Sequence, residues 1–186
     1  MKEKEQNIED LRKSLLNTDK CFYALFNQAT DSIFLMDPTP EDGPIILEAN
    51  NAACTIHGYT YEEIIGKPIT SLDDPESKKE VPERTQKLMA GETLIFEANH
   101  VRKDGSTFPV EISAQVIHIG EKPFILAIDR DITKRKETER LLKAKLIELQ
   151  EFYDFASARE RKINELNLKI AELQSELANI KNRFAK

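Results

Sequence analysis

Apolar residues gather in five short or alternating runs, which predict five β-strands over residues 33–36, 45–49, 94–102, 107–119 and 124–128. The third and fourth runs are separated by a turn containing Asp104-Gly105, a dipeptide typical of tight hairpins. The loop between the first two runs holds three prolines and a glycine, so these runs are also expected to pair. The sequence therefore predicts an antiparallel sheet.

Segments with a helical spacing of apolar residues lie between and outside these strands. This spacing predicts a helix over residues 1–19, its continuation over 22–30, short helical pieces over 50–68 and a polar helix over 73–90. The N-terminal helix has a narrow apolar face, which either covers the sheet or contacts a second copy of the chain. Strands and helices are not regularly alternating, so we expect an α+β fold, a five-stranded sheet with short helices on one face.

The last predicted strand leads directly into a long charged tail. Neither Gly nor Pro occurs after Pro123, so no residue of that kind interrupts the passage from strand to helix. Such a connection predicts mechanical coupling, in which distortion of the sheet tilts or rotates the exit helix. Short polar side chains at Asp131 and Thr133 can cap the start of that helix, with Arg102 or Lys103 as charge partners.

The tail carries the spacing of a coiled coil. Apolar residues follow each other at steps of three and four and form the expected dimerisation seam, Ile163, Leu166, Ile170, Leu173, Leu177 and Ile180. Ile at the first two a positions with Leu at d favours a parallel dimer, and Leu177 at a with Ile180 at d weakens that preference. An earlier apolar stripe from Leu142 to Ala156 has a different phase, so this part could instead pack on the domain or on the N-terminal helix.

Composition narrows the classes of function. A net charge of −6 and a pI near 5.3 argue against nucleic-acid binding, which needs a basic surface. The chain has no apolar run long enough to span a membrane, and its charged N-terminus is unlike a signal peptide. Two cysteines without a CxxC motif fit a reducing compartment. We therefore expect a cytoplasmic protein.

Several separated motifs resemble those of a PAS domain of the S-box type. They are Asn50-Asn51-Ala52, Gly58-Tyr59-Thr60, residues 62–68, residues 102–105, Phe108-Pro109-Val110 and Asp131-Ile132-Thr133. The resemblance covers residues 20–134, and implies a sensor domain there, preceded by a helix over 1–19 and followed by a linker helix and coiled coil over 135–186. It also implies that Asp131, Ile132 and Thr133 pass a signal into the exit helix. His57 departs from the residue types usual at its position.

The resemblance does not identify a ligand, and the cofactor stays unknown. Cys21 and Cys54 lie outside the motif of covalent flavin binders, no His lies in the helix over 83–90, and CxxCH is absent. A ligand would lie between the inner sheet face and the small helices. The candidate residues are Phe34, Ile56, His57, Phe96, His100, Val110, Ile112 and Leu126. The alternative is that these residues fill a dry core.

Metal binding, pH sensing and catalysis have at most weak signals in the sequence. Cys54 and His57 share a helical face but lack two further ligands at a suitable spacing, so no metal site is expected, and His57 should line the cavity or bond to backbone. His100 and His118 could respond to pH, although isolated histidines are usually structural. Motifs of hydrolases, phosphate-binding enzymes, histidine kinases and cyclases are absent, so no catalytic residues are expected.

These patterns together predict a sensory module that forms a homodimer through its flanking helices and signals to a protein partner. Two alternatives fit the same patterns. The chain could be the sensor fragment of a larger histidine kinase or cyclase, or a ligand-free dimerisation adaptor.

Overall fold

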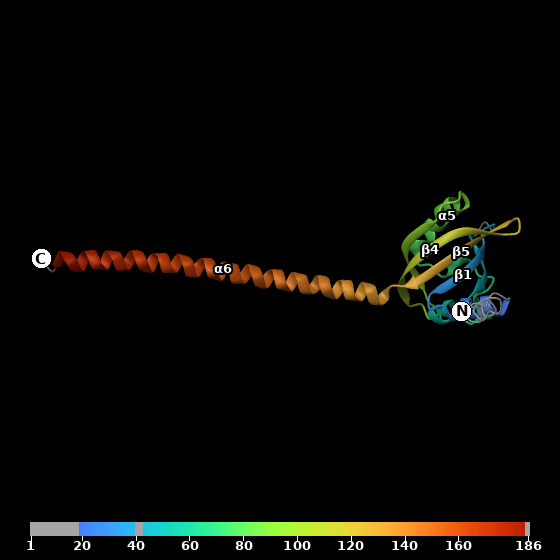
Figure 1. Cartoon of the computed structure of the whole chain (residues 1–186), viewed down its shortest axis with the longest axis horizontal. Helices are drawn as coiled ribbons and strands as arrows, with labels where there is room; N and C mark the ends of the chain where they lie inside the picture. The colour runs from blue at the N-terminus through green and yellow to red at the C-terminus, as the bar shows by residue number, and fades with distance from the viewer. Residues whose placement is uncertain (1–18, 40–42, 185–186) are drawn as a thin grey trace, which may run out of the picture. The chain divides into compact units, whose positions relative to one another are not determined.

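A computed structural model describes residues 19–39 and 43–184, so residues 1–18 of the helix predicted over residues 1–19 lie outside the description. The five predicted strands are present and form one antiparallel sheet of order β2-β1-β5-β4-β3 (Figure 1). Their bounds are β1 Ser32–Asp37, β2 Ile45–Ala49, β3 Leu94–Val101, β4 Thr107–Ile119 and β5 Lys122–Asp131. The sheet confirms the predicted α+β fold, and β5 lies at its centre between β1 and β4.

The helices also follow the sequence pattern. They are α2 Asp19–Gln28, α3 Asn51–His57, α4 Tyr61–Ile64, the 3-10 turn η1 Ile69–Ser71, α5 Pro75–Met89 and α6 Thr133–Phe184. A capping box formed by Thr60 and Glu63, a pattern visible in the sequence, begins α4. Gly58 ends α3 with a φ of 75°, a left-handed conformation that favours glycine.

Asn50 joins the first helix of the inner layer to the sheet. Its side-chain oxygen accepts hydrogen bonds from the amides of Ala53 and Ile33, at 2.9 and 3.0 Å. Its side-chain nitrogen donates to the carbonyls of Phe26 and Asp31, at 3.0 and 2.9 Å. Asn50 is fully buried, so this single amide fixes the start of α3 against β1 and the end of α2.

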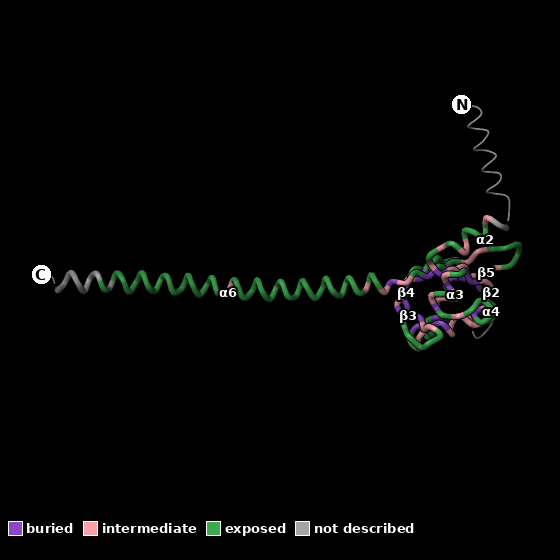
Figure 2. Tube along the Cα trace, turned by 90° about the horizontal axis from the view of Figure 1, so that it is seen from below, coloured by how far each residue is buried: buried purple, intermediate pink, exposed green. Residues whose placement is uncertain are grey.

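Strand alternation separates the two faces of the sheet. The buried inner-face residues of β1, β4 and β5 form the core with side chains of α3, α4 and α5. Figure 2 marks the buried residues of the domain in purple. Ile125 and Ala127 of β5 belong to this inner face, at 1% and 3% exposure. Leu126 lies between them and points to the opposite face, because successive strand residues alternate.

The outer face of the sheet lies beside α2. Phe22, Leu25 and Phe26 of this helix line a surface groove with Leu126 and other outer-face residues of the sheet. Phe22 and Leu25 remain 63% and 71% exposed. An apolar helix surface therefore stays open to solvent on this side of the domain.

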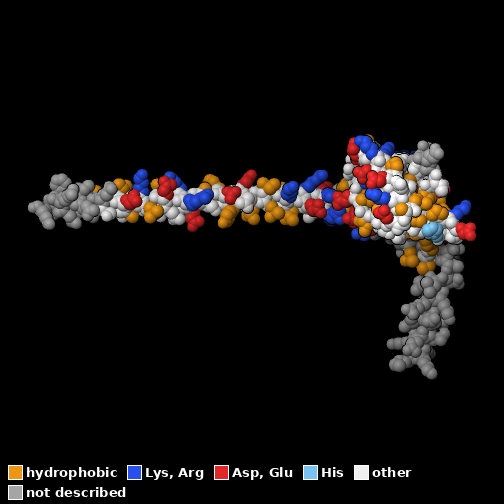
Figure 3. Space-filling view, turned by 90° about the horizontal axis from the view of Figure 1, so that it is seen from above, with side chains coloured by type: hydrophobic (Ala, Val, Ile, Leu, Met, Phe, Trp, Pro, Cys, Tyr) orange, Lys and Arg blue, Asp and Glu red, His pale blue; other side chains and the backbone are white. Residues whose placement is uncertain are grey.

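The chain divides into two compact units after Lys134, and the second consists of α6 from Arg135 onward. The helical tail is thus present as one continuous helix. Its described side chains are almost all exposed (Figure 2), and apolar groups recur along its length (Figure 3). Among the described residues, no helix, α6 included, has an apolar stretch long enough to cross a membrane.

Candidate functional site

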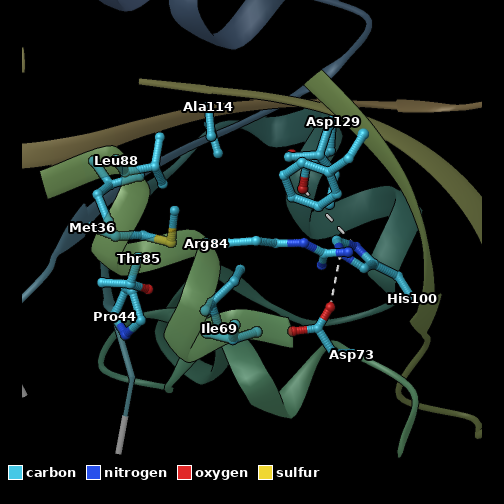
Figure 4. A pocket seen from close by; sticks show the side chains of 15 residues that line it. Met36, Pro44, Ile69, Asp73, Arg84, Thr85, Leu88, His100, Ala114 and Asp129 are labelled. Carbon is cyan, nitrogen blue, oxygen red and sulfur yellow. Dashed lines mark ion pairs between the residues drawn. The ribbon is translucent and has the colours of Figure 1, made fainter. Parts of the chain in front are cut away.

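A cavity of about 60 Å³ lies between the inner sheet face, η1 and α5 (Figure 4). Most of its wall is apolar and includes Met36, Ile69, Leu88 and Ile125. A cavity needs roughly 10–15 Å³ to hold one water molecule, so this one accommodates a few waters or a ligand of a few heavy atoms. Pockets that enclose a drug-sized ligand are larger, at roughly 300–1,000 Å³.

The structure brings together only part of the predicted ligand set. Phe96, His100 and Ile112 line the cavity. Phe34, His57 and Val110 are fully buried beside it, and the rings of Phe34 and His57 meet edge to face with centroids 5.6 Å apart. These three residues support the cavity wall without lining it.

Two predicted residues lie elsewhere. Ile56 lines a surface depression with Arg102 and Lys103 at the end of α3. Leu126 lines the outer groove beside α2, so its prediction as a cavity residue is wrong. The apolar run of the last strand gave no indication of its phase, and the inner positions belong to Ile125 and Ala127.

Sequence reasoning missed the most polar part of the wall, which consists of Asp73, Arg84 and Asp129. Asp73 and Asp129 are 5% and 2% exposed, although carboxyl groups are rarely buried without partners. A signal for Asp129 was present, because it lies two residues beyond Ala127 and so shares the inner face of β5. The position of Asp73 had no such local signal.

Two buried histidines connect this polar wall to α3. His57 Nδ1 lies 2.8 Å from the carbonyl oxygen of Ala53, and His57 Nε2 lies 2.9 Å from His100 Nδ1. A carbonyl only accepts, so His57 carries its proton on Nδ1 and, when neutral, accepts from His100 Nδ1–H. The prediction that His57 bonds to backbone is therefore confirmed. His100 Nε2 then presents a lone pair to the cavity.

His100 is also close to both buried carboxyl groups. Its Nε2 lies 3.5 Å from Asp73 Oδ1, and its Nδ1 lies 3.9 Å from Asp129 Oδ2, as the dashed lines of Figure 4 indicate. Neither His100 Nε2 nor Asp129 Oδ1 has a hydrogen-bond partner among the described residues. These two buried atoms are therefore available to water or to a small ligand in the cavity.

Burial sets the ionisation of this cluster. Removal from water lowers the pKa of His57 to about 4 and that of His100 to about 3, because it penalises the charged imidazolium. The same effect raises the pKa of Asp73 to about 7 and that of Asp129 well above its ordinary value. Near neutral pH the histidines are neutral and Asp73 is close to its midpoint, while burial favours the uncharged form of Asp129.

Arg84 of α5 places a cation at the same wall. Its guanidinium carbon lies 3.8 Å from the centroid of the Phe96 ring, and the group forms an ion pair with Glu80 one turn earlier on the helix. In Figure 4 the side chain extends from α5 toward His100. Arg84 therefore lies where it can partner an ionised Asp73, and its charge favours the ionised form.

A second polar group lies where β5 ends. Arg102 donates from Nε to the carbonyl of Ile56 at 2.8 Å and from a terminal nitrogen to Asp131 Oδ2 at 3.1 Å. The other oxygen of Asp131 accepts from the amide of Thr133, the first residue of α6, at 2.8 Å. Of the two charge partners considered for Asp131, the structure selects Arg102, while Lys103 pairs with Glu63.

Metal binding at Cys54 and His57 has no support in the geometry. Both ring nitrogens of His57 already face hydrogen-bond partners, and among the described residues no three His, Cys, Asp or Glu side chains are arranged to hold a metal ion.

The strand order, the small helices over one face and the interior cavity define an α+β domain with a small internal site. The chain belongs to the PAS domain family, whose profile matches residues 30–134.

Among curated proteins, the methyl sulfide methyltransferase-associated sensor of Methanosarcina acetivorans is 32% identical over 126 residues, which is 68% of this chain and 12% of the sensor. Blue-light-activated histidine kinase 1 of Erythrobacter litoralis is 26% identical over 92% of this chain and 52% of the kinase. The chain therefore spans only part of the length of these relatives.

Solved structures give the same assignment. The PAS domain of an HTR-like protein from Haloarcula marismortui is 30% identical, with a TM-score of 0.53 over 71% of this chain and all of that domain. A domain of a sensory box sensor histidine kinase/response regulator from Geobacter sulfurreducens is also 30% identical, with a TM-score of 0.52 over 60% and 92% of the two chains. The domain is thus related to PAS domains of signalling proteins.

Proposed function

We propose that this chain is a cytoplasmic sensory module that detects a change in its core cavity and transmits it through β5 into α6. The observation that carries the proposal is the position of β5. Asp129 of this strand lines the cavity, and Asp131, two residues later, accepts the first amide of α6. A change in the shape or charge of the cavity would therefore reach α6 by displacing only the short segment of β5 between Asp129 and Asp131.

Several hydrogen bonds hold the residues that lead from β5 into α6. Ile132 is 2% exposed, and its amide donates to the carbonyl of Pro109 on β4 at 3.0 Å. Asp131 is held by Arg102 on one oxygen and by Thr133 on the other. A displacement of β5 would therefore carry these contacts with it, which supports roles for Asp131, Ile132 and Thr133 in signal coupling.

We further propose that α6 pairs with the same helix of a second copy to form a homodimer. The predicted seam residues Ile163, Leu166, Ile170, Leu173 and Leu177 are 48–57% exposed in the single chain, and the side chain of Ile180 lies outside the described residues. A long helix with an uncovered apolar stripe gains stability when that stripe packs on a partner. The dimer would then present the change to a signalling partner.

The relatives favour one form of this role. Both curated relatives above are longer than the matched region, and one is named as a histidine kinase. The chain is therefore proposed as a sensor that serves a larger signalling protein, either as part of it or as a separate subunit. A ligand-free adaptor is the competing function, and the small cavity volume is the observation that favours it.

The coupling can be tested by changing the cavity and observing the helix. Ala114→Val adds volume at the cavity wall and should shift the NMR amide signals of residues 125–129 and of 133–136. When Asp131→Ala is added, we expect the strand signals to shift as before and the helix signals to stay in place. Asp104→Ala, which removes a carboxyl from an exposed turn, is the matched control.

The coupling would be refuted if Ala114→Val alone left the amide signals of residues 133–136 in place. Native mass spectrometry with an absorbance spectrum of the purified protein separates the two functions, because a bound small molecule supports sensing and an empty core supports the adaptor.

A further inference from the structure

The buried histidine pair is not needed for a signal that travels through β5, yet it joins the cavity to the exit joint by a second route. His57 is the last residue of α3, and its carbonyl accepts from the amide of Lys103 at 2.9 Å. The preceding carbonyl, of Ile56, accepts from Arg102 Nε. The end of α3 is therefore bonded to the residue that holds Asp131.

The hydrogen bonds of this route all run in one direction. His100 Nδ1–H donates to His57 Nε2, and His57 Nδ1–H donates to the carbonyl of Ala53. At the cavity end, His100 Nε2 is an unpartnered acceptor 3.5 Å from Asp73 Oδ1. This distance is longer than an ordinary hydrogen bond, and a small rotation of a protonated Asp73 would let it donate to Nε2.

We propose that His57 and His100 form a proton relay through which the ionisation of Asp73 is passed to α3 and, by way of Arg102, to Asp131. This proposal rests on the proposed function, because it adds a second input to the same exit helix. It assigns to His57, the residue that departs from the family pattern, the role of a positioning residue.

The proton balance is simple. In the protonated state Asp73 carries its proton and both histidines carry theirs on Nδ1. On ionisation, the Asp73 proton moves to His100 Nε2 and the His100 Nδ1 proton moves to His57 Nε2. His57 is fully buried and the carbonyl of Ala53 cannot take up its Nδ1 proton, so this proton passes to water only when the end of α3 moves away from its present position. One proton is released, Asp73 becomes a carboxylate, and both histidines stay neutral in the opposite tautomer.

This reversal has a structural consequence. Without a proton on Nδ1, His57 presents a lone pair to the carbonyl oxygen of Ala53, so their 2.8 Å contact changes from a hydrogen bond to a repulsion. The end of α3 must then shift, and the carbonyls of Ile56 and His57 carry their bonds to Arg102 and Lys103 with them.

The surroundings of Asp73 allow this ionisation near neutral pH. His100 of β3, Asp129 of β5 and Arg84 of α5 face it across the cavity, and Asp74 and Lys78 lie on the side of α5. Burial and the neighbouring carboxyl groups oppose its charge, while Arg84 and Lys78 favour it, and together they raise the pKa of Asp73 to about 7. The ring of His57 packs against the rings of Phe34 and Phe108, and the ring of His100 packs against that of Phe108.

The test is an NMR titration of the whole chain from about pH 5.5 to about pH 8.5, the range in which such a group changes charge. The probe is the proton itself, followed at the Asp73 carboxyl carbon, the four histidine ring nitrogens of the pair and the amide of Thr133. We expect one shared midpoint for all of them, with the ring signals reporting the exchange of tautomers. Asp73→Asn should abolish the transition everywhere.

Two variants separate the relay from the strand. His57→Phe fits among the neighbouring aromatic rings, and His57→Gln keeps a polar group if the first variant does not fold. In either one Asp73 should still titrate while the Thr133 amide no longer follows it. His118→Gln, at an exposed position of β4, is the matched control and should titrate as the unchanged protein does.

A Thr133 amide that follows Asp73 unchanged in a folded His57 variant would overturn the relay, and so would histidine rings that keep their tautomers. Neither result affects coupling through β5, which is judged separately by the response of α6 to Ala114→Val.

Discussion

Replacing Asp73 by Asn should change how the stability of the domain depends on pH. The variant keeps the shape of the side chain and removes its charge. Burial raises the pKa of Asp73 from 3.8 to about 7, so the folded state favours the protonated form. The resulting stabilisation is complete below the unfolded pKa of 3.8 and is lost as the pH rises to about 7.

The magnitude follows from the size of the shift. Each unit of pKa difference between folded and unfolded states corresponds to about 1.4 kcal/mol, so a shift of roughly three units corresponds to about 4 kcal/mol. The unchanged protein should therefore lose up to about 4 kcal/mol relative to Asp73→Asn between about pH 4 and about pH 7. His57, His100 and Asp129 are present in both proteins, so the difference reports Asp73 together with its electrostatic coupling to these neighbours.

The assay is urea unfolding at a fixed protein concentration, followed by tyrosine fluorescence because the chain has no Trp. Asp104→Asn is the control, since Asp104 is exposed and hydrogen bonds from Ser106 lower its pKa. A constant difference between Asp73→Asn and the unchanged protein would refute the raised pKa. A difference of opposite slope would show that Asp73 is ionised beside a charged His100.

Two further predictions concern other parts of the chain. Asn50→Ala should lower the free energy of unfolding by about 2–4 kcal/mol, because it removes a helix cap and leaves the partly buried carbonyls of Phe26 and Asp31 without their donor. Urea unfolding beside the exposed Asn51→Ala measures the loss, and a loss no larger than in that control contradicts the argument. Combining Leu166→Glu with Leu173→Glu should convert the dimer to monomers, as measured by light scattering. Leu168 is exposed and lies off the seam, so Leu168→Glu should leave the dimer intact. A dimer that survives the double substitution refutes the proposed pairing.

Local pattern determined most of the fold. The alternation of β3 and β4 placed Phe96, His100, Val110 and Ile112 on the buried face, and the structure confirms that side for all four. The capping box at Thr60 and the uninterrupted passage from β5 into α6 were also readable, because caps and chain breakers act within a few residues. A resemblance carried by separated motifs then identified the family.

The uniformly apolar run of β5 marked a strand without giving its phase. Leu126 was consequently assigned to the wrong face, and Asp129 was not recognised as a cavity residue. A run that is apolar at every position fits either face equally well, and only pairing with β1 and β4 decides which side chains turn inward.

The chemistry of the site was decided by tertiary structure alone. His57 and His100 are 43 residues apart, and Asp73 reaches them from the turn before α5. Their pKa values depend on burial and on each other, and neither quantity exists until the sheet and the small helices enclose them. The sequence by itself determined which segments form strands and helices, because those preferences are local. The folded chain decided which polar side chains share one cavity, because that depends on contacts between residues far apart in the sequence.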